Sequence, residues 1–178
     1  MNYKQKLIKI GLIIQGPINS IGRSGKSYYI PGPQVTSKHI TKYNCEENIS
    51  RIIGNYREIF DQIILSTWDD ENIYNNFEGI QTIKLSKNKV PKVNDWAGNQ
   101  NKYISKNNMY YQFYSIKEGC KLINDDITHI IKIRTDQYLD LKKIVNYFKK
   151  DYQKNTLVIP YLYKDTGIIP DFYIGADK

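Results

Sequence analysis

The sequence contains very few of the residues that bind soft metal ions or form disulfides. It has 178 residues, and only two are cysteines (Cys45 and Cys120) and two are histidines (His39 and His129). The histidines are too few and too isolated for a metal cluster or a Ser-His-Asp triad. The cysteines form no Cys-x-x-Cys pair, and both fall in segments with helical periodicity. We therefore expect buried free thiols and a protein of the reducing cytoplasm.

Long apolar runs and blocks of like charge are also absent. No run approaches the roughly 20 apolar residues that cross a bilayer, and the N-terminus lacks the long apolar region of a signal peptide. The net charge is +8, but the lysines are dispersed, as they are on a solvated exterior. We therefore expect no nucleic-acid partner. A basic surface would favour phosphorylated ligands, or peripheral contact with anionic lipid at the cytoplasmic face of a membrane.

Two phosphate-binding motifs are excluded by their spacing. Residues 22–27 (Gly-Arg-Ser-Gly-Lys-Ser) resemble part of a P-loop, but Ser20 stands where the first glycine of that motif belongs. The P-loop also needs a helix immediately after it, and Pro31 prevents one. No Gly-x-Gly-x-x-Gly segment occurs, so the dinucleotide-binding fingerprint is absent as well.

Apolar segments suited to strands alternate with segments of helical periodicity. Asn44 followed by Glu47 resembles a capping box at a helix start. Strands are predicted at 7–15, 61–67, 80–85, 129–135 and 156–161, and helices at 44–60, 109–123 and 139–150. A short apolar piece follows at 168–174. Residues 18–43 are predicted to form a long loop. The alternation predicts a single α/β domain over 1–178, with a mainly parallel sheet flanked by helices. The chain stops as a strand reaches a turn, so we expect its C-terminal part to be incomplete.

The segment Ile-Ile-Lys-Ile-Arg-Thr-Asp-Gln, residues 130–137, places charged residues at the carboxyl end of a predicted strand. In open α/β sheets that end is where ligands bind. The carboxylate of Asp136 can hold a divalent cation against the phosphates of a substrate. An ion pair at the strand end is the alternative, and the segment alone does not decide between the two.

Polar residues also follow the first and second predicted strands. Gln15, Gly16 and Pro17 come after the first, where glycine permits close approach of the backbone to a ligand and proline stiffens the turn. A plain turn is the alternative. Asp69 comes after the second, where its carboxylate can accept hydrogen bonds from a base or ribose. Its alternative role is a helix N-cap.

Five segments of the chain can be taken together. They are residues 13–18 (Ile-Ile-Gln-Gly-Pro-Ile), 56–60 (Tyr-Arg-Glu-Ile-Phe), 63–68 (Ile-Ile-Leu-Ser-Thr-Trp), Asn108-x-x-x-Gln112-x-x-Ser115, and 132–136 (Lys-Ile-Arg-Thr-Asp). In this order they resemble the WavE lipopolysaccharide-synthesis family, over nearly the whole chain. The resemblance implies a GT-A-like fold, the Rossmann-like fold of nucleotide-diphospho-sugar transferases. It also implies a glycosyltransferase that moves a sugar from a nucleotide-sugar donor to a lipopolysaccharide or other surface-glycan acceptor.

The resemblance implies roles for individual residues. Arg134-Thr135-Asp136 occupies the place of the Asp-x-Asp motif of GT-A enzymes, with arginine replacing the first aspartate. Either Asp136 alone anchors Mg²⁺ or Mn²⁺, or Arg134 and Lys132 neutralise the leaving diphosphate. Strand alternation puts these three side chains on one face. By the same similarity, the nucleotide is met by Gln15, Gly16, Pro17 and Asp69, the donor near its sugar by Asn108 and Gln112, and the acceptor by Asp171.

Two other functions are compatible with the sequence. A relative of such enzymes that keeps the sheet could bind sugar or nucleotide without transferring anything. A nucleic-acid-binding protein is favoured only by the positive charge and the 16 tyrosines.

Overall fold

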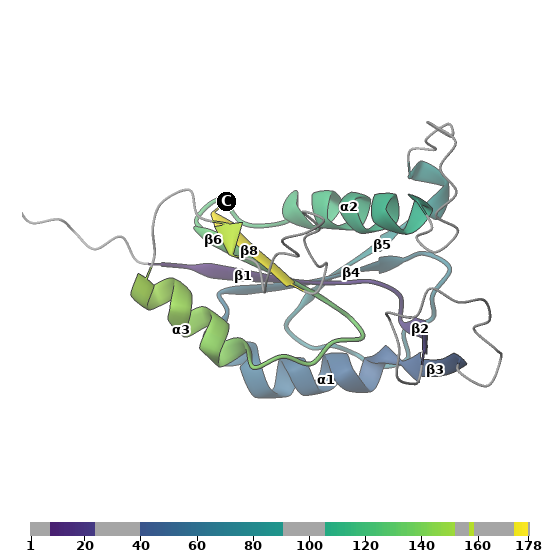
Figure 1. Ribbon diagram of the computed structural model, residues 1–178, viewed down its shortest axis with the longest axis horizontal. Coiled ribbons are helices and arrows are strands. Elements are labelled where there is room, and N and C mark those ends of the chain that lie inside the picture. The colour runs from purple at the N-terminus through teal and green to yellow at the C-terminus, as the bar shows by residue number, and fades with distance from the viewer. Residues whose placement is uncertain (1–7, 24–39, 91–105, 152–156, 159–172, 178) are drawn as a thin grey trace, which may run out of the picture.

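A six-stranded sheet forms the centre of the structure (Figure 1). The computed structural model describes residues 8–23, 40–90, 106–151, 157–158 and 173–177. The strands, in sheet order, are β5 (Gln81–Leu85), β4 (Gln62–Trp68), β1 (Ile10–Gln15), β6 (His129–Arg134), β8 (Tyr173–Asp177) and β7 (Leu157–Val158). The first four are parallel, and β8 is antiparallel to both of its neighbours. The predicted α/β fold with a mainly parallel sheet is confirmed.

β1 lies in the middle of the parallel part, between β4 and β6, and every one of its residues is buried. Its last residue, Gln15, is paired with Ser66 of β4 on one side and with Arg134 of β6 on the other. Along the sheet, the four parallel strands come third, second, first and fourth in chain order, so the order reverses between β1 and β6. Such a reversal leaves a crevice at the carboxyl ends of the two strands, and ligands of open α/β sheets bind there.

Helices cover both faces of the sheet (Figure 1). α1 (Cys45–Tyr56) and α3 (Leu141–Asp151) lie on one face, and α2 (Lys106–Cys120) lies on the other. The larger core cluster belongs to the first face and includes Leu12, Ile52 and Phe148. On the second face, Ile13 and Ile64 of the sheet pack in a smaller cluster with Ile123 and Ile127. Two short 3₁₀ helices, η2 (Arg57–Ile59) and η3 (Lys87–Lys89), complete the helices of the described part.

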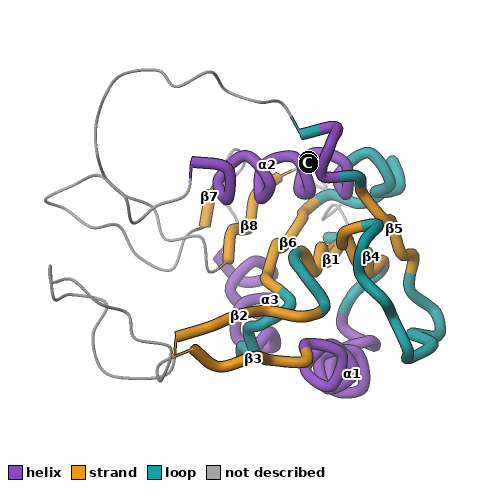
Figure 2. The backbone as a smooth tube through the Cα atoms, turned by 90° about the vertical axis from the view of Figure 1, so that its right-hand side faces the viewer, coloured by secondary structure: helices purple, strands orange, loops and turns teal. Residues whose placement is uncertain are grey.

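The predicted loop over 18–43 is wrong at both of its ends. β2 (Asn19–Arg23) and β3 (Ile40–Asn44) pair as an antiparallel ribbon, with Asn19 opposite Asn44 and Arg23 opposite Ile40. Figure 2 shows this ribbon side by side with the start of α1 and separate from the main sheet. Residues 24–39, between the two strands, lie outside the described part. Hydrophobic periodicity does not predict this ribbon, because neither strand carries an apolar run or a clear alternation of apolar and polar residues.

α1 begins where the sequence predicts, but with a different partner for its cap. The side chain of Asn44 accepts a hydrogen bond from the backbone N–H of Glu46, at 2.9 Å. The predicted capping box assigned the acidic role to Glu47, which is exposed. Glu46 is the buried residue, and its carboxylate accepts from the backbone N–H groups of Tyr74 and Asn75. The acidic side chain therefore fastens a loop to the helix start.

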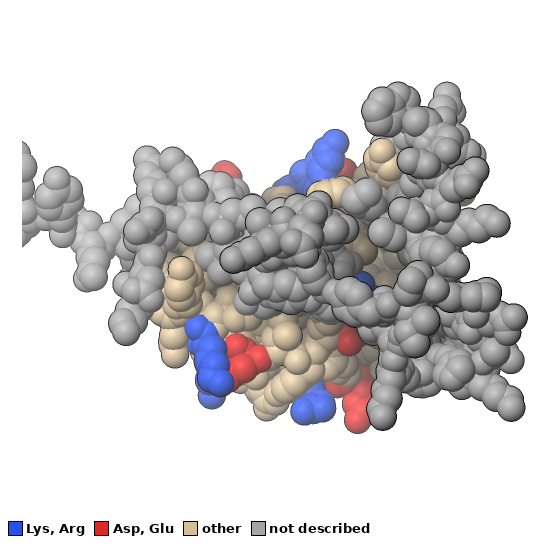
Figure 3. Space-filling model, in the orientation of Figure 1, with Lys and Arg blue, Asp and Glu red and all other residues tan. Residues whose placement is uncertain are grey.

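The surface of the described residues is mixed in charge. On the face drawn in Figure 3, Lys and Arg side chains lie in small groups near Asp and Glu side chains. Some opposite charges form exposed ion pairs, such as Lys87–Asp70 and Lys121–Glu118, each at 2.7 Å. Within the described ranges, none of the helices has the length and hydropathy needed to span a bilayer.

Candidate functional site

The carboxyl ends of β1, β4 and β6 are tied together by main-chain hydrogen bonds. The Thr135 N–H, just after β6, donates to the Gln15 carbonyl at 2.9 Å, and the Gly16 N–H donates to the Ser66 carbonyl at 3.0 Å. The Thr135 hydroxyl donates to the Pro17 carbonyl at 2.7 Å. The turn after β1 and the segment after β6 therefore form one structure at the switch point of the sheet.

Gly16 is required at this place by its backbone and by its neighbour. Its φ is +131°, a conformation that residues with a Cβ rarely adopt, and a Cβ would lie 2.7 Å from Thr135 Oγ1. The sequence predicted a close approach of this glycine to a ligand. In the structure the Thr135 side chain also lies close to it, so the glycine is needed for the turn itself, and its approach to a ligand stays a prediction.

Arg134 and Asp136 form a two-point ion pair. Arg134 Nε donates to Asp136 Oδ1 at 2.8 Å, and Nη2 donates to Oδ2 at 2.6 Å. The Ser20 hydroxyl of β2 also lies 3.3 Å from Asp136 Oδ2. The side chains keep 34% and 19% of their exposure, so the pair sits at the surface of the switch point without being fully solvated. The ion pair that the sequence offered as an alternative is present.

Lys132 lies deeper on the same strand. It is 3% exposed, and its register partners are Ile13 of β1 and Ile174 of β8. Side chains alternate along a strand, so Lys132 and Arg134 point to the same face, the one that α2 covers. Lys132 therefore adds positive charge beneath Arg134, at a level below the rim of the sheet.

Gln15 is buried between the sheet and α2. It is 1% exposed, and its Oε1 accepts from the Ser115 hydroxyl at 3.0 Å. The Ser66 hydroxyl donates to the Ser115 carbonyl, also at 3.0 Å. The Gln112 carbonyl, one turn earlier on α2, receives a further bond from the Ser115 hydroxyl at 3.1 Å. Through these contacts α2 is fixed over the carboxyl ends of β1 and β4, with Gln112 half-buried.

The remaining predicted site residues are less closely connected to this cluster. Asp69 is exposed after β4, and its backbone N–H donates to the Leu85 carbonyl at 2.9 Å. It is therefore on the same rim of the sheet, on the β5 side. Asn108 belongs to α2, but its side chain lies outside the described part, and so does the whole of Asp171.

The described side chains do not form a set that fits a divalent metal. No three of the His, Cys, Asp and Glu residues among them come close enough to share an ion. The one candidate carboxylate, Asp136, has both oxygens engaged by Arg134. Mg²⁺ and Mn²⁺ prefer several oxygen ligands, so this donor set is a poor match for either ion.

The family resemblance seen in five segments of the sequence extends over most of the chain. Residues 10–159 match the model of the family described as WavE lipopolysaccharide synthesis. The chain belongs to the WavE family. Membership of the WavE family indicates a role in lipopolysaccharide synthesis. No curated protein and no solved structure matches the chain.

Two residues of this WavE-family site were missed by sequence reasoning. Thr135 had no role of its own between Arg134 and Asp136, yet it is fully buried and connects the ends of β1 and β6. Strand alternation could have indicated it, because Thr135 follows Ile131 and Ile133 on the core face. Asn48 of α1 donates to two backbone carbonyls of the same segment. A residue that binds only main-chain atoms leaves no signal in the sequence.

Neither cysteine of the WavE-family chain forms a disulfide, and the predicted burial holds for Cys45 but not for Cys120. Cys45 is the first residue of α1 and Cys120 is the last of α2. Cys45 is buried below the segment after β6, while Cys120 is half-buried. Burial raises the pKa of the Cys45 thiol, and a hydrogen bond with Thr135 acts in the opposite direction. The Cys45 thiol is therefore a packing element of the site.

Proposed function

We propose that this chain is a glycosyltransferase that moves a sugar from a nucleotide-sugar donor to a lipopolysaccharide or other surface-glycan acceptor. The observation that carries the proposal is the position of the Arg134–Asp136 pair at the switch point between β1 and β6. That is where sheets of this type bind nucleotides. Family membership supports the biological role, and the site chemistry supports the donor.

In this proposal the leaving diphosphate is met by Arg134. Glycosyl transfer leaves negative charge on the departing nucleoside diphosphate, and a cation fixed in advance at that position lowers the barrier. Asp136 fixes the plane of the guanidinium through its two hydrogen bonds. Lys132 adds positive charge from below. A divalent cation would supply the same neutralisation, but the described donor set fits one poorly, so the proposal assigns this work to Arg134.

The other predicted residues are assigned around the diphosphate. The nucleotide lies along the turn formed by Gly16 and Pro17, with Asp69 on the rim beyond it. α2 approaches the donor near its sugar through Asn108 and Gln112, and Gln15 holds α2 in place through Ser115. Asp171 remains a candidate for the acceptor side. The acceptor is a glycan or glycolipid, and the net charge of +8 favours contact with an anionic membrane at its cytoplasmic face.

Isothermal titration with ADP, CDP, GDP and UDP tests the donor class directly. We expect at least one of them to bind. We expect Arg134→Ala to weaken that binding by about tenfold or more, the scale of a charge-assisted hydrogen bond. Lys121→Ala is the matched control, since it removes one positive charge at the far end of α2, where Lys121 is paired with Glu118. If none of the four nucleotides binds the wild-type chain, the proposal is wrong.

Transfer itself needs a second measurement. Release of nucleoside diphosphate from the matching nucleotide sugar would support an enzyme. Binding of the nucleotide without any release, in the presence of a glycan acceptor preparation, would instead support the non-catalytic binding module.

A further inference from the structure

One side-chain amide of α1 binds two backbone carbonyls of the segment that carries Asp136. Asn48 Nδ2 donates to the Thr135 carbonyl at 2.7 Å and to the Gln137 carbonyl at 2.8 Å. The Thr135 carbonyl belongs to the peptide group that precedes Asp136, and the Gln137 carbonyl belongs to the peptide group that follows Gln137. An asparagine amide has two N–H donors, so the two bonds together span Asp136 and Gln137.

We propose that Asn48 is a positioning residue for the donor site, acting through Asp136 on Arg134. This inference rests on the proposed function, because it gives a ligand-binding consequence to a contact inside the protein. Asn48 binds the peptide group that precedes Asp136 and, one residue beyond Asp136, the Gln137 carbonyl, and together these contacts limit the direction in which the Asp136 side chain leaves the backbone. Asn48 therefore determines whether the carboxylate meets the guanidinium of Arg134 at two points.

The sheet side of the segment is fixed independently. Thr135 binds the carbonyls of Gln15 and Pro17, as described above. The Gln137 N–H donates to the Arg134 carbonyl at 3.3 Å, and the Gln137 side-chain oxygen accepts from the Arg134 N–H at 3.3 Å. These bonds close a turn over Asp136 on the sheet side. The two bonds from Asn48 hold the same turn on the side of α1.

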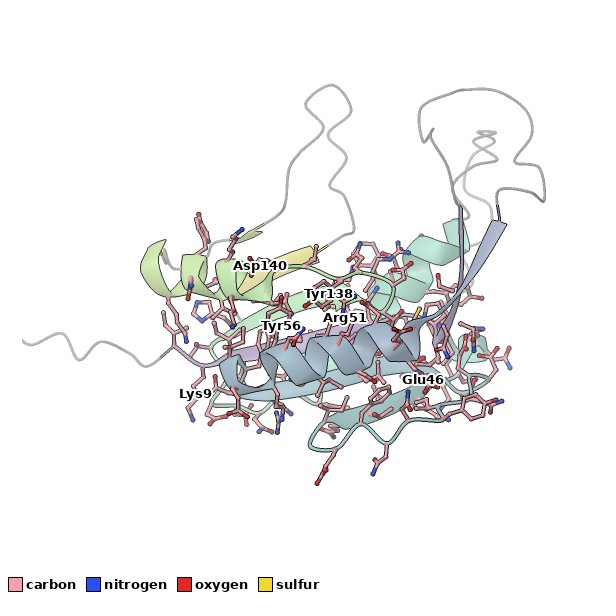
Figure 4. All side chains as sticks on the ribbon, turned by 90° about the horizontal axis from the view of Figure 1, so that it is seen from below. Lys9, Glu46, Arg51, Tyr56, Tyr138 and Asp140 are labelled. Carbon is pink, nitrogen blue, oxygen red and sulfur yellow. The ribbon has the colours of Figure 1, made fainter. Side chains whose placement is uncertain are left out.

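α1 holds the same segment at a second place, two residues further along. Arg51 lies over the Tyr138 ring at 4.2 Å, and Asn55 Nδ2 donates to the Tyr138 hydroxyl at 2.8 Å. Figure 4 shows Arg51 and Tyr56 of α1 next to Tyr138. Asn48, Arg51 and Asn55 are three and four residues apart, so they form one stripe on the helix.

This arrangement supplies a matched control. Asn55 is the same residue type on the same helix and binds the same segment, but it contacts a side chain and does not flank Asp136. Asn55→Ala therefore removes a tie between α1 and the segment without altering the peptide groups of Asp136. A merely structural role for Asn48 would give the same results for Asn48→Ala and Asn55→Ala.

The first readout is the NMR signal of the Arg134 Nε–H group, which the bond to Asp136 protects from exchange with water. We expect faster exchange in Asn48→Ala and in Asn48→Asp, which keeps the shape but cannot donate. We expect wild-type exchange in Asn55→Ala. The second readout is titration with the nucleoside diphosphate that binds the wild type. We expect about tenfold weaker binding in both Asn48 variants and unchanged binding in Asn55→Ala.

The two readouts separate the two proposals. Unchanged Nε–H exchange in the Asn48 variants overturns the positioning role, whatever happens to nucleotide binding. Equal changes in Asn48→Ala and Asn55→Ala also overturn it, because the effect is then general loosening of the segment. If exchange changes as expected but no nucleoside diphosphate binds the wild type, the proposed function fails and the positioning of Arg134 by Asn48 stands. If Asn48→Asp does not fold, Asn48→Ala decides the question.

Discussion

Arg134 and Asp136 bind each other through two parallel hydrogen bonds at the end of β6, at 2.8 Å and 2.6 Å. The sequence identified both residues and offered two interpretations, either an ion pair at the strand end or separate roles, with a metal for Asp136 and the diphosphate for Arg134. In the structure they are one unit, in which the carboxylate orients the guanidinium. Changing either residue therefore changes the behaviour of the other, and experiments on the two cannot be interpreted separately.

The first prediction concerns Asp136→Asn. The amide keeps the size of the carboxylate but has one acceptor oxygen and no charge, so it cannot hold Arg134 at two points. We expect binding of the nucleoside diphosphate to weaken by about tenfold, and by the same factor in EDTA and in Mn²⁺. Isothermal titration under both conditions measures this.

The control for that experiment is Asp126→Asn. Asp126 forms a 2.6 Å ion pair with Lys9, is exposed, and precedes the amino end of β6. Removing its charge should leave nucleotide affinity unchanged. A loss that occurs only in Mn²⁺, with binding in EDTA equal to wild type, would contradict the prediction and restore Asp136 as a metal ligand.

The second prediction compares two glycines. Gly16→Ala forces a Cβ onto a backbone at φ +131° and to within 2.7 Å of Thr135 Oγ1. We expect the free energy of unfolding to fall by about 1–3 kcal/mol. Gly54, in α1, has open space around its Cβ position. Gly54→Ala should raise the free energy of unfolding by about 0.5–1 kcal/mol, because alanine suits a helix better.

Urea unfolding of the two glycine variants measures both changes. A Gly16→Ala protein as stable as the wild type would show that the turn relaxes easily. The tie between the turn and Thr135 would then be weaker than the distances indicate.

The parallel strands β1, β4 and β6 were predictable because they are largely buried, whereas β5 at the edge of the sheet is mostly exposed. A near-continuous apolar run such as that of β1 is typical of a strand in the buried centre of a parallel sheet. The polar residues that end these runs then had to lie on one rim, which is why Gln15, Asp69 and Arg134 were found. The β2–β3 ribbon was not predictable, since its strands pair with each other at a distance in the chain and carry no apolar pattern.

The contacts that helix side chains make with backbone groups also could not be predicted from the sequence. Asn48 and Glu46 both bind main-chain groups of segments far along the chain, near residues 136 and 75. Every residue offers such groups, so nothing at the partner positions marks them. The capping pattern pointed to Glu47 for the same reason, because spacing alone cannot say which of two adjacent carboxylates turns inward.

The third prediction tests that point with Glu46→Ala and Glu47→Ala. Both residues are in the first turn of α1, so both variants lose a similar favourable interaction with the helix dipole. Only Glu46 also binds two backbone N–H groups, at 2.8 Å and 2.9 Å. We expect Glu46→Ala to lower the free energy of unfolding by about 1.5–3 kcal/mol more than Glu47→Ala does. Equal losses in urea unfolding would show that the two bonds contribute nothing.

The last prediction concerns the ionisation of Tyr56. Its hydrogen bond to Tyr138, together with burial, raises its pKa to about 12 from an ordinary value of 10, and the same bond lowers the pKa of Tyr138. We expect Tyr138→Phe, which keeps the ring and removes the acceptor, to lower the Tyr56 pKa toward 10. The ¹³Cζ signal of Tyr56 followed against pH measures this. Tyr147→Phe, at an exposed site on α3, should leave the titration unchanged.

The sign of the stability effect follows from the raised pKa. Above pH 10 the unfolded chain loses the Tyr56 proton first, so between pH 10 and about 12 it binds fewer protons than the folded chain. The contribution of Tyr56 is therefore complete below pH 10 and is lost as the pH rises through about 12. The lowered pKa of Tyr138 acts oppositely, giving stability above its ordinary pKa that is lost as pH falls through the folded value. A Tyr56 midpoint near 10 in the wild type would show that the two hydroxyls are not bonded. The tie between α1 and the segment after β6 would then depend on the hydrogen bonds of Asn48 and Asn55 and on the contact of Arg51 with the Tyr138 ring.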